Sequence, residues 1–187
     1  TPYNWTGGVY NTFTYKHFEL RFLLSVKSGG HIISTTIQNM QFNGGLAASA
    51  GTNPRGGLVR DPLSVNGGYL FDGTDVETGK PNSTYVDAQA LYSDWNFPTT
   101  DYIFSASNIK LKELSIAYKF PSAFIKRLKI SNLGVSVFAR NLWLIQNGLP
   151  GIDTETANMG SLNNGAGLET GSLPDTRSFG ASITIGL

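Results

Sequence analysis

The sequence predicts an all-β protein made of long antiparallel strands. Apolar and polar residues alternate along several stretches, and this period of two marks strands with one apolar and one polar face. Charged residues make up only 14% of the chain, against roughly 25% in average soluble domains, whereas aromatic residues reach 12% and glycine occurs 22 times. The alternation alone fits a soluble β-sandwich and a transmembrane β-barrel equally well.

Five stretches exceed the usual strand of about 5–6 residues and are long enough to cross a bilayer, which takes about 9–11 tilted residues. These stretches are residues 5–16, 18–27, 108–120, 133–146 and 177–187. Their length favours the barrel over the sandwich.

The first two stretches have the parity of a hairpin, because their apolar residues change from odd to even positions. If Tyr15 pairs with Phe18 across a two-residue turn, Phe13 meets Leu20, and both apolar sets share one face. The pair 108–120 and 133–146 follows the same rule across an even-numbered connection.

One strand carries an irregularity. Within 108–120 the apolar residues occupy odd positions at Ile109 and Leu111 but even positions from Leu114 onward. One explanation is a β-bulge near Lys112-Glu113 that resets the register. The alternative is that Ile109 and Leu111 face a packed lumen; we favour the bulge.

Aromatic residues lie near the ends of the expected strands, as in the girdles that barrels place at bilayer interfaces. They are Trp5, Tyr15, Phe18, Tyr118, Phe120, Trp143 and Phe179. Barrels of this kind have short periplasmic turns and long extracellular loops. Residues 16–17 and 121–132 are therefore expected to be periplasmic, and 28–107 and 147–176 extracellular.

The first long loop is too long to lack structure. We expect a short helix over 34–43 and a small hairpin that pairs 68–71 with 83–86, while 147–176 reads as irregular coil.

Several motifs add a resemblance to a known family. The stretch 106–146 contains Ser-Asn-Ile-Lys-Leu-Lys-Glu-Leu at 107–114, Ala-Tyr-Lys-Phe-Pro at 117–121 and Phe-Ala-Arg-Asn-Leu at 138–142. Trp-Thr-Gly-Gly at 5–8 and Leu-Pro-Gly-Ile-Asp at 149–153 extend the pattern. With these motifs the chain resembles the C-terminal end of the SusC/RagA family of TonB-dependent outer-membrane transporters.

The resemblance implies that residues 1–187 are about five C-terminal strands of a large plugged barrel, which has about 22 strands in such transporters. The plug and the remaining strands are expected elsewhere, because an open sheet edge in lipid leaves unpaired backbone groups. The implied function is TonB-dependent import of a glycan or peptide across the bacterial outer membrane. The implied partners are a SusD-like surface lipoprotein, the TonB complex, the oligosaccharide or peptide substrate, membrane lipid and the rest of the barrel. The alternatives are a siderophore or vitamin receptor of the TonB-dependent group, and a soluble β-sandwich that binds carbohydrate.

No catalytic motif is present. The two histidines, His17 and His31, are not part of a metalloprotease, P-loop or nucleophile-elbow pattern. We therefore predict no enzymatic activity and no cofactor. The net charge of +1 argues against nucleic acid. Three carboxylates within 72–77 could hold Ca²⁺, but they lack the EF-hand spacing. A solvated turn is the favoured interpretation, so no metal is predicted.

Two groups of residues are candidates for function. Aromatic side chains crowd one segment of the first long loop and suit contact with a nutrient or a lipoprotein lid: Tyr85, Tyr92, Trp95, Phe97 and Tyr102. The alternative is that these rings pack the loop onto its own core. Charged side chains on the inward faces are Glu19, Arg21, Glu113 and Arg140. They are expected either to form a lumen salt-bridge lattice or to line a substrate path.

Overall fold

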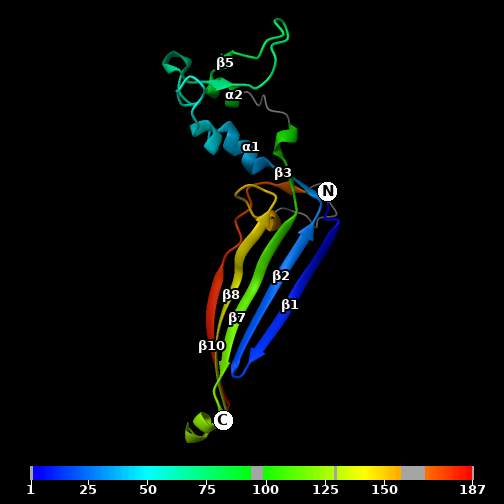
Figure 1. Ribbon diagram of the computed structural model, residues 1–187, viewed down its shortest axis with the longest axis vertical. Helices are drawn as coiled ribbons and strands as arrows, with labels where there is room; N and C mark the ends of the chain where they lie inside the picture. Colours follow the sequence, from blue (N-terminus) through cyan, green and yellow to red (C-terminus); the bar gives the residue numbers. More distant parts are fainter. Residues whose placement is uncertain (1, 94–98, 129, 157–166, 187) are drawn as a thin grey trace. The chain divides into compact units, whose positions relative to one another are not determined.

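The computed structural model describes residues 2–93, 99–128, 130–156 and 167–186, and its largest element is a five-stranded antiparallel sheet (Figure 1). In spatial order the strands are β1 (Trp5–Tyr15), β2 (Phe18–Ser28), β7 (Asn108–Lys119), β8 (Asn132–Asn147) and β10 (Ser178–Gly186). All five predicted strands are confirmed, each within one residue of its expected ends. Leu187, the last residue of the final predicted strand, lies outside the described residues.

The predicted hairpin register between β1 and β2 is confirmed. Tyr15 lies opposite Phe18 and Phe13 lies opposite Leu20. Lys16, the first of the two turn residues, has a φ of 54°. Two-residue hairpin turns need positive φ because their backbone then follows the twist of the strands.

The strand registers place the apolar residues on one face of the whole sheet. Phe13, Leu20, Ile116, Val137 and Ala181 lie opposite one another in sequence and form one row across all five strands. Most side chains in this row remain exposed, with 55% of Phe13 and 56% of Val137 accessible, whereas Leu20 is half-buried. We call this side of the sheet the apolar face.

The neighbouring row has a different character and lies on the opposite side, the polar face. It consists of Thr14, Glu19, Ala117, Ser136 and Ser182. Successive side chains point to opposite faces of a strand, so a polar and an apolar surface are separated by a single layer of backbone.

The predicted bulge in β7 is confirmed. Leu23 lies opposite Glu113 whereas Leu24 lies opposite Leu111, so Lys112 is the extra residue. A second irregularity faces it in β8, where Leu111 pairs with Trp143 but Glu113 pairs with Arg140. The bulge returns Leu111 to the apolar face, beside Leu24.

Shorter elements connect the long strands of the five-stranded sheet. A small sheet of order β6-β3-β9 is formed by β3 (His31–Ser34), β6 (Ile103–Ser105) and β9 (Leu168–Glu169). These strands were not predicted, because two to four residues are too few to show a period. The short connection between β7 and β8 contains α3 (Ser122–Ile125) and a 3₁₀ turn at Lys126–Leu128. No helix in the described part of the chain is long and apolar enough to cross a bilayer.

Residues 34–103 form a separate compact unit. It contains α1 (Thr35–Phe42), β4 (Tyr69–Leu70), β5 (Tyr85–Val86), α2 (Ala88–Ser93) and 3₁₀ turns at Ala47–Ala50, Leu63–Val65 and Thr99–Tyr102. The predicted helix and hairpin are thus confirmed.

Two features stabilise this unit. The Ser34 hydroxyl accepts a hydrogen bond of 3.2 Å from the Ile37 N–H and caps α1, as serine commonly does at helix starts. Its buried core consists of Val59, Ala88, Leu91 and Tyr92, with Tyr69 and Val86 packed against it. The long loop is therefore a small folded unit.

Candidate functional site

The unit of residues 34–103 contains a cleft of about 410 Å³. Ligand sites typically have volumes of about 300–1,000 Å³. The cleft is lined by Phe42, Asn43, Gly44, Ser49, Arg60, Ala88, Gln89 and Tyr92. Aromatic and small side chains thus share the lining with amide and guanidinium groups.

The end of α1 supplies one wall of the cleft. Phe42 is the last residue of α1, and the Asn43 N–H donates to the Asn39 carbonyl at 3.0 Å. The Ser49 hydroxyl donates to the Gly44 carbonyl at 2.5 Å and is also within 2.8 Å of the Leu46 carbonyl. These bonds hold the turn after α1 in place.

The opposite wall comes from α2. The Asp87 carboxylate accepts a 3.1 Å hydrogen bond from the Ala90 N–H at the start of this helix. Ala88 and Tyr92 are four residues apart and therefore lie on the same side of the helix. Burial raises the pKa of the Tyr92 hydroxyl, and the nearby Tyr69 adds to this effect. The hydroxyl therefore stays protonated at neutral pH.

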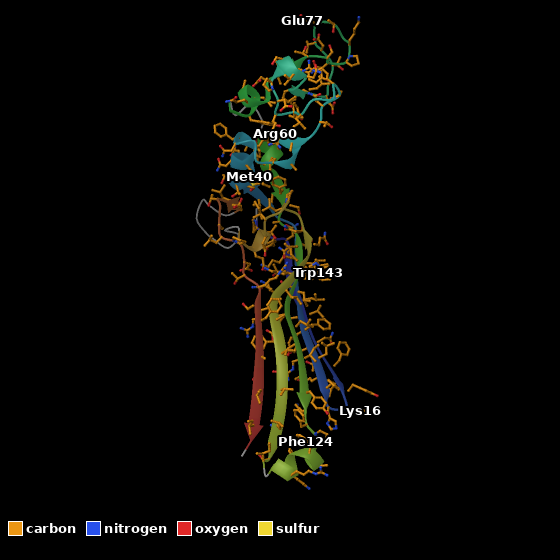
Figure 2. All side chains as sticks on the ribbon, turned by 90° about the vertical axis from the view of Figure 1, so that its left-hand side faces the viewer. Lys16, Met40, Arg60, Glu77, Phe124 and Trp143 are labelled. Atoms are coloured by element: carbon orange, nitrogen blue, oxygen red, sulfur yellow. The ribbon has the colours of Figure 1, made fainter. Side chains whose placement is uncertain are left out.

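Arg60 brings a full positive charge to the cleft. Its side chain is exposed, it is labelled in Figure 2, and it forms no salt bridge with any residue that the structure describes. Gln89 and Asn43 are also exposed. Aromatic rings beside exposed donor groups suit ligands with a polar edge and an apolar surface.

The five predicted aromatic residues have different positions. Tyr92 is only 9% exposed and belongs both to the core and to the cleft. Tyr102 is 4% exposed and is packed inside the unit. Tyr85 is half-buried in β5, with the Arg55 guanidinium 3.7 Å from its ring centroid. Trp95 and Phe97 lie outside the described residues.

The four predicted charges lie on the polar face and form ion pairs. Glu19 contacts Arg21, and its other oxygen lies 3.6 Å from the Lys119 ammonium. Glu113 lies opposite Arg140 in the register, at 3.9 Å between their charged atoms. Each predicted charge therefore has a partner of opposite sign.

A third charged group was not predicted. The Lys110 side chain is only 3% exposed, and its ammonium lies 2.5 Å from Asp153, 2.7 Å from Asp175 and 3.1 Å from Glu155. Lys110 belongs to the motif at 107–114 and Asp153 to the motif at 149–153. Two motifs that look independent in the sequence therefore meet in an ion-pair cluster. The presence of both motifs in one chain was the sequence signal from which this cluster could have been predicted.

Glu155 connects this cluster to two further lysines. It contacts Lys112 and lies 2.7 Å from the Lys27 ammonium. Burial alone would raise the pKa of the Glu155 carboxyl, but hydrogen bonds from Lys112, Lys27 and Lys110 outweigh it and lower the pKa to about 2. Glu155 is therefore ionised at neutral pH.

The carboxylates of this cluster have a spacing that could hold a metal ion. One oxygen from each of Asp153, Glu155 and Asp175 lies within 4.8 Å of the others. The Lys110 ammonium contacts all three carboxylates and occupies the position that a metal cation would take. The arrangement is better suited to fixing the loop after β8 onto β7 than to binding a metal.

The acidic segment 72–77 forms a turn. One Asp75 oxygen accepts hydrogen bonds from the N–H groups of Glu77 at 3.0 Å and Thr78 at 2.8 Å, and from the Thr78 hydroxyl at 2.9 Å. These bonds lower the pKa of the Asp75 carboxyl. Its carboxylates do not converge on a common point as those of Asp153, Glu155 and Asp175 do.

Comparison with known proteins gives consistent likenesses. No family model matches the chain. A relative in Formosa agariphila, TonB-dependent receptor P3, is 26% identical over 184 residues, which is 96% of this chain and 16% of the relative.

Structures of the RagAB peptide importer share the fold at 20% identity. Their TM-scores are 0.60 for the closed-closed state and 0.54 for the open-open state, and a structure of the RagAB peptide transporter gives 0.56. Each match covers 97% of this chain but 17% of the other. The sequence match and the shared antiparallel sheet confirm that this chain resembles part of a TonB-dependent transporter of the SusC/RagA type.

Proposed function

We propose that this chain is part of a TonB-dependent transporter that imports a large nutrient, a glycan or a peptide, across the bacterial outer membrane. The observation that carries the proposal is the apolar row across all five strands, in which Phe13, Ile116 and Val137 are exposed. Contiguous exposed apolar surface of this kind marks a membrane or protein contact. On long strands with a polar opposite face, it matches the lipid-facing surface of a barrel.

The same observation weighs against a soluble β-sandwich. A sandwich buries its apolar face under a second sheet, whereas no described segment covers Phe13 or Val137. If this exposed face met water, a charged side chain there would cost little. In a bilayer it costs about 2–4 kcal/mol at the midplane.

Residues 1–187 contribute five strands to the barrel in this proposal, as its C-terminal part. The edges of the sheet are β1 and β10. Both edges need further strands, because unpaired backbone groups in lipid cost several kcal/mol each. The rest of the transporter supplies these strands, the plug inside the barrel and the segment that engages TonB. The polar face, with Glu19, Arg21, Glu113 and Arg140, then faces the lumen.

The short connections lie on the periplasmic side, so the unit of residues 34–103 is extracellular. Binding residues commonly lie on loops that a rigid scaffold holds, and this unit carries the cleft lined by Tyr92 and Arg60. We infer that the cleft contacts either the nutrient or a SusD-like surface lipoprotein that covers the barrel mouth. The solved structures that share the fold are of the RagAB peptide importer, and this name supports a peptide as one candidate nutrient.

The experiment uses cells that produce the full transporter, with and without functional TonB. Uptake of a labelled peptide mixture and of a labelled oligosaccharide mixture is measured in parallel, together with surface expression and co-purified lipoprotein. TonB-dependent uptake of either mixture supports the import function. Uptake of neither mixture, at normal surface expression, contradicts it.

The cleft is tested in the same cells with Arg60→Ala and Gln89→Ala. Both side chains are exposed, so these changes leave the core of the unit intact. Lys80→Ala, an exposed position of the same unit outside the cleft, is the matched control. Reduced uptake or reduced lipoprotein retention in the cleft variants alone supports the proposal, whereas behaviour equal to the control removes the cleft from the site.

A further inference from the structure

Positive charge gathers at the end of the sheet that carries the short connections. Lys16 lies in the β1–β2 turn, Lys119 ends β7, and Lys126 and Arg127 lie in the connection to β8. We call these four residues the basic rim. Figure 2 labels Lys16 and Phe124 at this end of the sheet and Trp143 toward the other end.

The basic rim is not balanced by acidic residues. Within 14–21 and 116–136 the sequence has one carboxylate, Glu19. Glu19 is already engaged by Arg21 and Lys119. Lys126 and Arg127 are exposed and form no salt bridge with any described residue. The excess charge is therefore available to an external anion.

A continuous set of aromatic rings adjoins the basic rim. The Phe18 and Tyr118 ring centroids are 4.7 Å apart, those of Tyr118 and Phe120 are 5.0 Å apart, and those of Phe120 and Phe124 are 5.3 Å apart. Phe18 and Phe124 remain about half exposed. The set thus runs from the apolar face of β2 to the helix α3, beyond the last residue of β7.

This order of chemistry matches one leaflet of a bilayer. Apolar strand residues meet acyl chains, aromatic rings meet the boundary between acyl chains and headgroups, and cations lie one step further out. Lys16 follows the same order, since its ammonium lies 5.4 Å from the Tyr15 ring centroid. Cations at such a position attract anionic headgroups.

We propose that the basic rim binds the headgroups of anionic phospholipid in the periplasmic leaflet of the outer membrane. The proposal rests on the orientation given under Proposed function. It goes further by assigning a lipid class to this end of the barrel. Charge complementarity favours this partner. The phosphate of a lipid can pair with the cations of the basic rim while its acyl chains contact the aromatic rings. A protein partner would have to supply both an acidic surface and an apolar one.

The test uses the full transporter in phosphatidylcholine vesicles that contain a photoactivatable phosphatidylglycerol, with photoactivatable phosphatidylcholine of the same acyl chains as the parallel probe. Crosslinked peptides are mapped by mass spectrometry. Peptides that cover 116–131 should be labelled preferentially by the phosphatidylglycerol probe. Lys126→Gln with Arg127→Gln should reduce that preference about fivefold for each charge removed.

Three variants serve as controls. Lys126→Arg with Arg127→Lys keeps both charges and should keep the preference. Lys80→Gln removes one charge from the unit 34–103 and should change nothing in these peptides. If the double glutamine variant fails to insert, as judged by heat-modifiable migration, Lys16→Gln on the other connection should show the reduced preference.

Equal labelling by the two probes, or an unchanged preference in the glutamine variants, overturns the proposal. A periplasmic protein would then be the alternative partner of the basic rim. Nutrient uptake is measured separately on the same variants. Absence of uptake by the wild-type transporter, with its lipid preference intact, would contradict the import function instead, so the two failures can be distinguished.

Discussion

Lys110 and Asp153 form a buried ion pair, with 2.5 Å between the ammonium and a carboxylate oxygen, that joins β7 to the loop after β8. Lys110 is on the polar face beyond the bulge, opposite Ser25. Asp175 and Glu155 complete its surroundings. One lysine thus fixes three points of a loop to the end of the sheet.

Replacing this lysine is the first prediction. Lys110→Met should destabilise the full transporter by on the order of 3 kcal/mol, because removing one partner of a buried ion pair leaves its carboxylates uncompensated. The measurement is the free energy of unfolding in denaturant after reconstitution. Lys112→Met is the control, since Lys112 is more exposed and contacts one carboxylate; we expect about 1 kcal/mol or less. Equal losses in the two variants would show that Lys110 has no special role.

The second prediction concerns acid. The pKa of Glu155 is near its ordinary value of 4.5 in the unfolded chain and about 2 in the folded one. A carboxyl with a lowered folded pKa contributes stability above its unfolded pKa and loses that contribution as the pH falls toward the folded pKa. The wild-type transporter should therefore lose stability between about pH 4.5 and pH 2.

Glu155→Gln should lose less stability over the same range, because glutamine does not titrate. Denaturant midpoints at pH 7, 4 and 2.5 compare the two proteins. Parallel pH profiles would mean that the Glu155 carboxyl does not carry this part of the acid sensitivity.

Arginine scanning across the two faces gives the third prediction. Val137→Arg and Ile183→Arg place a charge on the apolar face and should cost about 2–4 kcal/mol near the bilayer midplane. Ser136→Arg and Ser182→Arg, their immediate neighbours on the polar face, should cost less. The readout is the yield of heat-modifiable barrel in the outer membrane. Similar yields for both pairs would show that the faces are assigned wrongly.

The bulge at Lys112 supplies the fourth prediction. Deleting Lys112 shifts residues 108–111 by one position, and a shift of one residue moves every side chain to the other face of a strand. Lys110 would then enter the lipid-facing side and lose its carboxylates. We expect failure of barrel assembly, whereas deletion of Gly73 from the exposed loop of the unit 34–103 should be tolerated. Normal assembly of the Lys112 deletion would show that the register can be absorbed elsewhere.

The sheet could be predicted closely from the sequence for a physical reason. Residues directly opposite in a hairpin share a face, so the switch in parity between Tyr15 and Phe18 determines the register. The same logic located the bulge, because Ile109 and Leu114 break the alternation by one residue. In a long strand the alternation of apolar and polar residues is repeated many times, so the register is determined by many residues.

The ion-pair cluster and the cleft could not be predicted in the same way. Lys110 and Asp175 are 65 positions apart, and no local period relates them. The cleft depends on how α1, α2 and the turn at Arg60 pack, which alternation does not encode. Tyr92 illustrates the limit: its residue type indicated a ligand contact, but only the packing of the unit shows that its ring lies in both the core and the cleft wall.

The central claim is that the apolar face contacts lipid, and accessibility of spin labels on β8 tests it most directly. Single labels are placed at consecutive positions from Leu133 to Arg140 in a cysteine-free full transporter reconstituted in vesicles. Their collision rates with oxygen, which concentrates in lipid, and with a water-soluble nickel complex are then compared. We expect a strict alternation along β8. Labels at Val135 and Val137 should collide with oxygen but not with the nickel complex, whereas the label at Ser136 should not show this preference for oxygen. Equal access of the nickel complex to Val137 and Ser136 would contradict it.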